Sequence, residues 1–202
     1  MKVIGITGGV GAGKSTVVGI IQKHFPSVYL HCDVIAHDLM LPGGRAYPEL
    51  VETFGMRILS EDKTIDRKAL YEAAFPSGRV EELNACVHPH VREVVEETIA
   101  KLRDEQFEGF VLIEAALLIE AGYREICDEL WYVTAPKELR RERLRANRGY
   151  SEEKIDSIMK EQSSDEYFLK HCDFVLRNDS ALKDCESNIL SQIKMHQKEA
   201  LS

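Results

Sequence analysis

A glycine-rich segment near the start of the chain carries the residues with the clearest chemical potential. Gly8, Gly13, Lys14 and Ser15 match the spacing G-x-x-x-x-G-K-[ST]. In such a loop the backbone N–H groups point inward and, with the positive end of the following helix, surround a phosphate chain. We therefore predict that this segment binds a nucleoside triphosphate and that the Ser15 hydroxyl also ligates Mg²⁺. The eight predicted binding residues are Gly8, Gly9, Gly11, Ala12, Gly13, Lys14, Ser15 and Thr16.

The flanking sequence predicts the elements that this loop needs. Residues 3–6 are apolar, as in a short buried strand, and apolar residues recur at helical spacing over 17–21. The alternative is a glycine turn that binds no ligand. The strand–loop–helix context favours the phosphate loop.

Five apolar segments alternate with helical patterns, which implies a parallel sheet with helices on both faces. The expected strands are residues 3–6, 28–32, 109–113, 129–133 and 174–176. A chain of 202 residues is expected to form one α/β domain, 1–202, with a helical insertion at about 60–105. Within that insertion, Pro89 is predicted to lie in the first turn of a helix.

Three carboxylates follow expected strands, at the edge where parallel α/β sheets hold ligands. Asp33 could cap the next helix or act as a catalytic base, and its position leaves both roles open. Glu114 and Glu120 are candidates for a place near Mg²⁺ or its waters, and equally for solvated loop carboxylates.

A cluster of arginines marks the later part of the chain. Within nine residues Glu142 is the one acid, beside Arg140, Arg141, Arg143, Arg145 and Arg148. Charge runs usually form solvated faces, but this imbalance is unusual in an acidic protein. Phosphate neutralisation is the favoured explanation, because guanidinium groups match phosphate oxygens.

The composition limits the partners. A formal net charge of −8 argues against nucleic acid or an anionic membrane as the main partner. No apolar run approaches the ~18 residues that span a bilayer, so we expect a cytoplasmic protein. The five cysteines are far apart without a C-x-x-C pair, and we expect reduced, partly buried thiols.

Taken together, the motifs resemble those of the dephospho-CoA kinase family, nearly from end to end. The resemblance rests on residues 4–9 leading into the loop, 33–36, 65–67, Leu83-Asn84 followed by 88–92, Leu117-Leu118 with Glu120, and Asp173 with Asn178. It implies a P-loop NTPase of adenylate-kinase-like fold, with a helical substrate-binding insertion and a lid at about 140–151. It also implies ATP- and Mg²⁺-dependent phosphorylation of the ribose 3′-hydroxyl of dephospho-CoA, the last step of coenzyme A biosynthesis.

The resemblance also implies roles for single residues. Asp33, Lys14 and Arg140 would be catalytic, and Arg143 would bind the nucleotide. Asp33, Arg67, His88 and Arg92 would contact dephospho-CoA.

Three departures from the family pattern affect these assignments. His31 stands where an aspartate is common, Ala116 where a proline is usual, and Asn147-Arg148 where an arginine and an acid or amide are expected. The rival enzyme is another small phosphotransferase, such as a nucleoside monophosphate kinase. A GTPase switch lacks support because no N-K-x-D motif exists, and the oligomeric state is expected to be a monomer or a small homo-oligomer.

Overall fold

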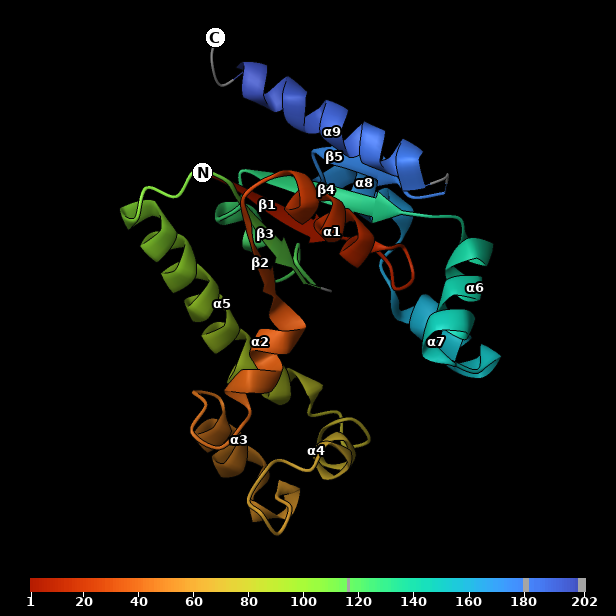
Figure 1. The fold of residues 1–202 in the computed structure, drawn as a ribbon. Coiled ribbons are helices and arrows are strands. Elements are labelled where there is room, and N and C mark those ends of the chain that lie inside the picture. The colour runs from red at the N-terminus through yellow and green to blue at the C-terminus, as the bar shows by residue number, and fades with distance from the viewer. Residues whose placement is uncertain (116, 180–181, 200–202) are drawn as a thin grey trace. The chain divides into compact units, whose positions relative to one another are not determined.

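The computed structural model describes residues 1–115, 117–179 and 182–199, so Ala116 lies outside the described residues. Within these ranges the chain forms a five-stranded sheet in the order β2-β3-β1-β4-β5 (Figure 1). The strands are β1 (Lys2–Thr7), β2 (Ser27–His31), β3 (Phe110–Glu114), β4 (Glu129–Thr134) and β5 (Phe174–Arg177). β1 pairs in parallel with β3 and β4, and β4 pairs in parallel with β5, which confirms the expected parallel sheet.

The chain divides into two compact units. The first contains Met1–Tyr29 and the chain from Glu108 onward, and the second contains Leu30–Phe107. The second unit therefore begins well before residue 60, where the sequence predicted the insertion to start. The division of the whole chain into a single domain with a lid stays a prediction.

The first unit has a core on one face of its sheet. The helices α1 (Lys14–His24) and α9 (Leu182–Glu199) contact each other, and Figure 1 shows both beside the strands. Side chains alternate along β4, because successive residues of a strand point to opposite faces. Trp131 packs into the core with α1 and α9, whereas Tyr132 stacks on Phe168 of α8 (Asp165–His171) with ring centroids 4.7 Å apart.

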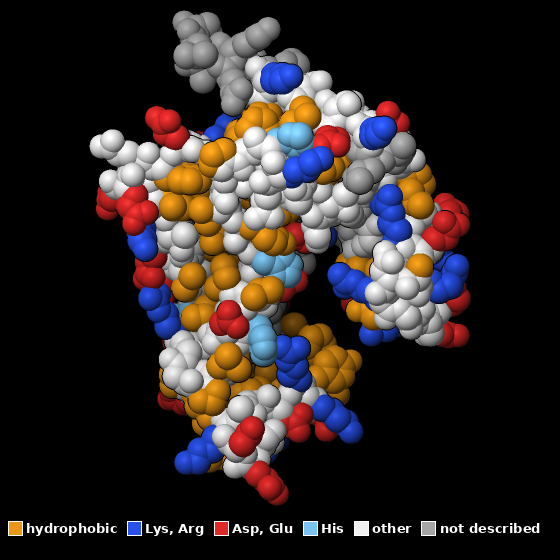
Figure 2. Space-filling model, viewed as in Figure 1, with side chains coloured by type: hydrophobic (Ala, Val, Ile, Leu, Met, Phe, Trp, Pro, Cys, Tyr) orange, Lys and Arg blue, Asp and Glu red, His pale blue; other side chains and the backbone are white. Residues whose placement is uncertain are grey.

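Two further helices of this unit, α6 (Lys137–Arg148) and α7 (Glu152–Glu161), follow β4. Gly149 ends α6 with φ of 61°, and the Ser151 hydroxyl caps α7 by accepting a hydrogen bond from Lys154 N–H. Figure 2 shows basic and acidic side chains interspersed over α6 and α7. Among the described residues, no helix is both long enough and apolar enough to cross a lipid bilayer.

The second unit is helical. Its helices are α2 (Cys32–Leu39), α3 (Tyr47–Phe54), the short 3₁₀ helix η1 (Met56–Ile58), α4 (Arg67–Ala74) and α5 (Val80–Asp104). The Asp66 carboxylate starts α4 by accepting hydrogen bonds from Lys68 and Ala69 N–H. α2 and α3 both contact α5, which is the longest of these helices.

The helix around Pro89 differs from its prediction. The sequence indicated that Pro89 begins a helix, but α5 begins nine residues earlier, at Val80, and Pro89 lies inside it. An interior proline removes a backbone hydrogen bond, at a cost of about 3 kcal/mol. The helix nevertheless continues because a buried stripe runs through this position, formed by Cys86, Val87, Val91, Val95 and Ile99.

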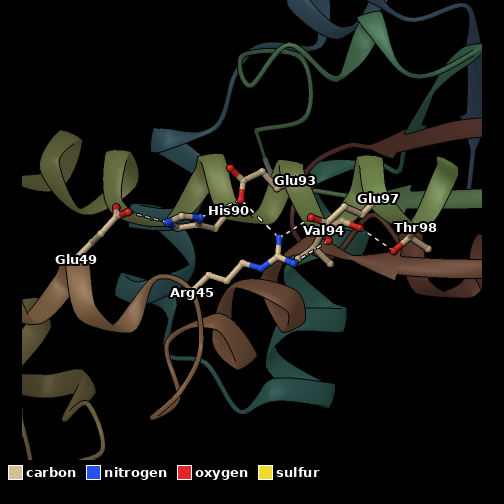
Figure 3. Close-up of polar contacts among 7 residues, drawn as sticks. All are labelled: Arg45, Glu49, His90, Glu93, Val94, Glu97 and Thr98. Carbon is tan, nitrogen blue, oxygen red and sulfur yellow. Dashed lines mark hydrogen bonds and ion pairs between the residues drawn. The ribbon is translucent and has the colours of Figure 1, made fainter. Parts of the chain in front are cut away.

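A group of ion pairs joins α3 and the segment before it to α5 (Figure 3). His90 lies between two carboxylates, with Nε2 2.9 Å from Glu49 and Nδ1 3.1 Å from Glu93. Arg45 forms a bidentate contact with Glu97 at 2.8 and 2.9 Å. These contacts hold α3 against α5 from the solvent side, while the apolar stripe holds it from the inside.

Candidate active site

The glycine loop lies at the carboxyl end of β1, the central strand of the sheet. The backbone φ angles of Gly8, Gly11 and Gly13 are 140°, 82° and 94°. Residues with a Cβ atom rarely adopt such positive φ angles. α1 begins at Lys14, directly after the loop, so the N-terminal end of this helix, which carries partial positive charge, adjoins the loop. These features fit the phosphate cradle that the motif predicts.

Lys14 lies between a carbonyl and a buried carboxylate. Its Nζ donates to the carbonyl oxygen of Gly8 at 3.0 Å and lies 3.8 Å from Glu114 Oε1. Glu114 is only 7% exposed, and the Tyr29 hydroxyl donates to its Oε2 at 2.6 Å. A buried carboxylate needs such partners. Glu120, by contrast, is exposed and accepts a hydrogen bond from Ser163.

Two arginines of α6, Arg140 and Arg143, reach the glycine loop, and they are the two to which the family resemblance gave roles. Arg140 Nε donates to the carbonyl oxygen of Val10 at 2.9 Å, and its terminal nitrogen contacts Gln162. Arg143 contacts the Ala12 carbonyl at 3.3 Å. Partial burial lowers the pKa of Arg140, because burial disfavours its charged form.

Two other arginines of this cluster face α7 instead. Arg141 pairs with Asp156 and Glu152, and Arg145 also pairs with Glu152. The acids that balance these charges therefore follow on the next helix, outside the nine residues in which the imbalance was noted. Phosphate neutralisation is not needed to explain Arg141 and Arg145.

A cavity of about 470 Å³ opens beside Arg140. Its lining includes Tyr132, Gln162, Asp165 and Arg177. Burial raises the pKa of Tyr132 to about 12, so its hydroxyl stays protonated and donates to Asp165 at 2.5 Å. The cavity thus offers an aromatic wall with fixed polar groups, a combination suited to a small polar ligand.

The residues expected to contact the acceptor all lie in the helical unit. Desolvation lowers the pKa of His88 on α5, and the negative charge of Asp33 on α2 opposes that decrease, so the two groups interact. Arg67 on α4 contacts His37 Nδ1 at 2.8 Å, and His37 follows Asp33 by one helical turn. The structure therefore brings Asp33, His88 and Arg67 to one helix cluster around α2.

Arg92 lies one turn after His88 on α5, where its Nε donates to Glu96 at 2.7 Å. The shared spacing places both residues on one side of α5. Its proposed contact with the acceptor stays a prediction.

The alternative role for Asp33, capping the next helix, is wrong. α2 begins at Cys32 with His31 at the capping position, so Asp33 already lies within the first turn and is exposed. Strand β2 ends at His31 and the helix begins at the next residue, so His31 rather than Asp33 precedes the helix, and among the described residues no side chain caps it. Its charge still interacts favourably with the helix dipole.

Four contacts at these sites come from residues to which the sequence gave no role. Tyr29 and Gln162 reach their partners from distant parts of the chain, and no local pattern marks them. His37 could have been found from its spacing of four residues after Asp33. Asn178, matched to the family together with Asp173, donates to the Ala12 carbonyl, whereas Asp173 accepts from Leu130 N–H at the start of β4.

Comparison with known proteins gives a consistent result. A family model described as dephospho-CoA kinase matches residues 2–184. The chain is similar to a dephospho-CoA kinase of Moorella thermoacetica, at 36% identity over 94% of this chain and 89% of the relative. A crystal structure from Thermus thermophilus has a TM-score of 0.80 at 30% identity, covering 96% of this chain and 97% of that chain.

A dephospho-CoA kinase structure from Campylobacter jejuni has a TM-score of 0.70 at 26% identity, covering 99% of this chain and all of that chain. The match thus includes the glycine loop, the helical unit and the arginines of α6, rather than the phosphate loop alone. With sequence, fold and loop geometry in agreement over nearly its full length, the chain belongs to the dephospho-CoA kinase family.

Proposed function

We propose that this protein transfers the γ-phosphoryl group of ATP to the ribose 3′-hydroxyl of dephospho-CoA, which completes coenzyme A. The observation that carries the proposal is the glycine loop between β1 and α1, with Lys14 at its end, in a chain of this family. Membership of a kinase family implies ATP as the donor. We propose the cytoplasm as the site of the reaction and a monomer or small homo-oligomer as the active form.

The loop would bind the triphosphate. Backbone N–H groups at the start of α1 and the Lys14 ammonium supply positive charge where the β- and γ-phosphates lie. Arg140 and Arg143 already lie at this loop, so their charges can stabilise the transferred group as it moves. Catalysis of this kind depends mainly on positioning and charge stabilisation.

The proposed metal is Mg²⁺, held by the Ser15 hydroxyl together with phosphate oxygens. Ser15 is exposed in the first turn of α1, where its hydroxyl can reach an ion beside the loop. When bound, Mg²⁺ neutralises charge that develops between the β- and γ-phosphates. Within the described ranges, no group of three or more His, Cys, Asp or Glu side chains could hold a metal ion, so phosphate oxygens and waters would be needed beside Ser15.

The helical unit would bind dephospho-CoA. Asp33 would orient the 3′-hydroxyl and accept its proton, which leaves the oxygen late in the transfer. His88 interacts with Asp33, while Arg67 and Arg92 carry positive charge suited to the phosphates of the acceptor. Movement of the segment at about 140–151 would exclude water, which otherwise competes as acceptor.

An acceptor panel tests this proposal. The enzyme is offered ATP, Mg²⁺ and one of five acceptors: dephospho-CoA, AMP, CMP, UMP or shikimate. We expect turnover with dephospho-CoA to exceed that with the others by about 10³ or more, because a site that hydrogen-bonds its substrate rejects analogues lacking the matching groups. Preferred turnover of a nucleoside monophosphate would instead establish the rival enzyme. The product is then identified as coenzyme A by its mass. Isolated product that is returned to the enzyme with ATP should not be phosphorylated again.

A further inference from the structure

Asn178 is a buried amide that lies far from the glycine loop in the sequence but contacts it in the fold. It follows β5 directly and is only 5% exposed. Its Nδ2 donates to the carbonyl oxygen of Ala12 at 2.9 Å, across 166 residues of sequence. Its backbone N–H donates to the Thr134 carbonyl at 2.8 Å, which fixes the residue to the end of β4.

Arg143 joins Asn178 to the same part of the loop. One terminal nitrogen of Arg143 contacts the Ala12 carbonyl at 3.3 Å, and the other donates to the Asn178 carbonyl at 2.9 Å. The Ala12 carbonyl therefore has two side-chain donors, one neutral and one charged. Arg140 holds the Val10 carbonyl in the same manner.

Gly13 is what permits this approach. The Asn178 Nδ2 occupies the place where a Cβ of residue 13 would lie. Any larger residue at 13 would displace the amide, in addition to straining the backbone at φ of 94°. The absence of a side chain at Gly13 thus makes room for Asn178. The motif alone explains this glycine only by the room that the phosphates need.

A trans peptide unit directs its carbonyl oxygen and the following N–H group in opposite directions. A donor that fixes the Ala12 carbonyl on one side therefore fixes the Gly13 N–H on the other side. We propose that Asn178 is a positioning residue for nucleotide binding: its amide holds the Ala12–Gly13 peptide so that the Gly13 N–H faces the phosphates before ATP arrives. The inference rests on the proposed nucleotide site but does not depend on the identity of the acceptor.

Asn178→Asp tests this role, because it keeps the shape but removes the donor and sets a carboxylate against a carbonyl. Asn178→Ala removes the contact without adding charge. We expect the dissociation constant of ATP, measured by calorimetry, to rise about threefold to tenfold in both, because the Ala12 carbonyl then keeps only the longer contact with Arg143. The affinity for dephospho-CoA should change less than about twofold.

Asn188→Asp is the matched control, since it makes the same chemical change at an exposed position of α9. Its ATP affinity should equal that of the wild type. An unchanged ATP affinity in folded Asn178→Asp and Asn178→Ala would overturn the proposal. So would an equal loss of affinity for ATP and dephospho-CoA, which indicates a general loss of structure.

A measurement on the wild type keeps the proposal testable if both variants unfold. Without nucleotide, the side-chain amide protons of Asn178 should exchange with solvent at least about tenfold more slowly than those of Asn188, as expected for a buried, hydrogen-bonded group. Equal exchange rates would overturn the inference. A wild type that binds ATP but does not phosphorylate dephospho-CoA would contradict the proposed function and leave this inference intact.

Discussion

Side chains around the glycine loop act through the particular backbone atoms that they reach. Arg140, Arg143 and Asn178 contact carbonyl oxygens, and Lys14 lies between the Gly8 carbonyl and Glu114. The donors to the Ala12 carbonyl direct the N–H group of the following residue, Gly13, toward the opposite side of the peptide. The loop is thereby organised before it meets a phosphate, which avoids reorganisation during the reaction.

Lys14→Ala should lower kcat by about 10²–10³, because it removes a strong electrostatic contact with the charge that develops on the phosphates. Steady-state kinetics with saturating ATP and dephospho-CoA measure the effect. Circular dichroism should show an intact fold. Because Lys14 also lies beside the buried Glu114, Lys14→Ala combined with Glu114→Gln separates any loss of stability from the loss of rate. A kcat near the wild-type value would contradict the assignment of the loop.

Asp33→Asn should lower kcat by about 10²–10⁴, the usual range for a lost general base. Asp33 is exposed in the first turn of α2, so losing its charge should reduce the free energy of unfolding by about 1 kcal/mol or less. Thermal unfolding and single-turnover kinetics measure the two effects, and ATP affinity should remain within about twofold. If the variant retains wild-type turnover, the base is another residue, and Glu114 is the next to test.

At the scale of helices, the arginines of α6 form two groups with different partners. Arg140 and Arg143 face the glycine loop, while Arg141 and Arg145 pair with acids of α7. α6 and α7 are therefore joined to each other by ion pairs and to the loop by two guanidinium groups. Such a pair of helices can move as one body when nucleotide alters its contacts with the loop.

ATP should protect the junction between α6 and α7 from trypsin. Arg145 and Arg148 are exposed beside Gly149, and we expect cleavage there in the free enzyme. Saturating ATP should slow this cleavage about fivefold or more, because proteolysis requires local opening. Cleavage after Lys63, an exposed turn residue of the helical unit, is the internal control. Equal rates at the junction with and without ATP would indicate a solvated helix rather than a lid.

The contact between α3 and α5 should depend on pH through His90. Hydrogen bonds with Glu93 and Glu49 raise the pKa of His90, so the charged ring stabilises the folded state. That contribution is complete below the ordinary pKa of about 6.5 and is lost as pH rises through the raised value. The midpoint of thermal unfolding should therefore fall more between about pH 6 and 8.5 in the wild type than in His90→Gln.

His171→Gln, at an exposed position of α8, is the matched control for this titration. It should retain the full pH dependence of the wild type. Arg45 also contacts Glu93, so the comparison must keep Arg45 unchanged. Identical pH profiles for the wild type and His90→Gln would show that the contacts of His90 with Glu49 and Glu93, drawn in Figure 3, do not stabilise the unit.

Across the whole molecule, the sequence predicted what local patterns encode. Apolar runs located all five strands: the inner strands β1, β3 and β4 are almost entirely buried, and the edge strands β2 and β5 are partly buried. The glycine motif located the loop, and the arginine cluster included the two arginines that reach it. The sequence did not predict the partners that meet only after folding: Tyr29 with Glu114, Gln162 with Arg140, and Asn178 with Ala12. The position of Pro89 within its helix was predicted wrongly, because tertiary packing of α5 outweighs the preference of proline for the first turn of a helix.

The cysteines give a prediction for the entire chain. All five are reduced thiols; Cys32, Cys86, Cys127 and Cys185 are buried, and burial raises the pKa of Cys172 to about 11. Since the thiolate is the reactive form, native protein at pH 8 should take up iodoacetamide far more slowly than denatured protein. Mass spectrometry should find less than about one label per native chain when unfolded chains are fully labelled. Rapid labelling of Cys172 would contradict this expectation, and Cys172→Ser identifies its contribution.

The position of the helical unit in the sequence also governs how the chain is made. β1 ends at Thr7, but its partner β3 begins at Phe110, and the entire unit Leu30–Phe107 lies between them. At ribosomal rates of about 5–20 residues per second, the apolar segment of β1 waits roughly 5–20 s for that partner. The helical unit is contiguous and can fold while the sheet is still incomplete. The nascent chain therefore exposes a future central strand for many seconds, a period in which a chaperone and aggregation compete for it.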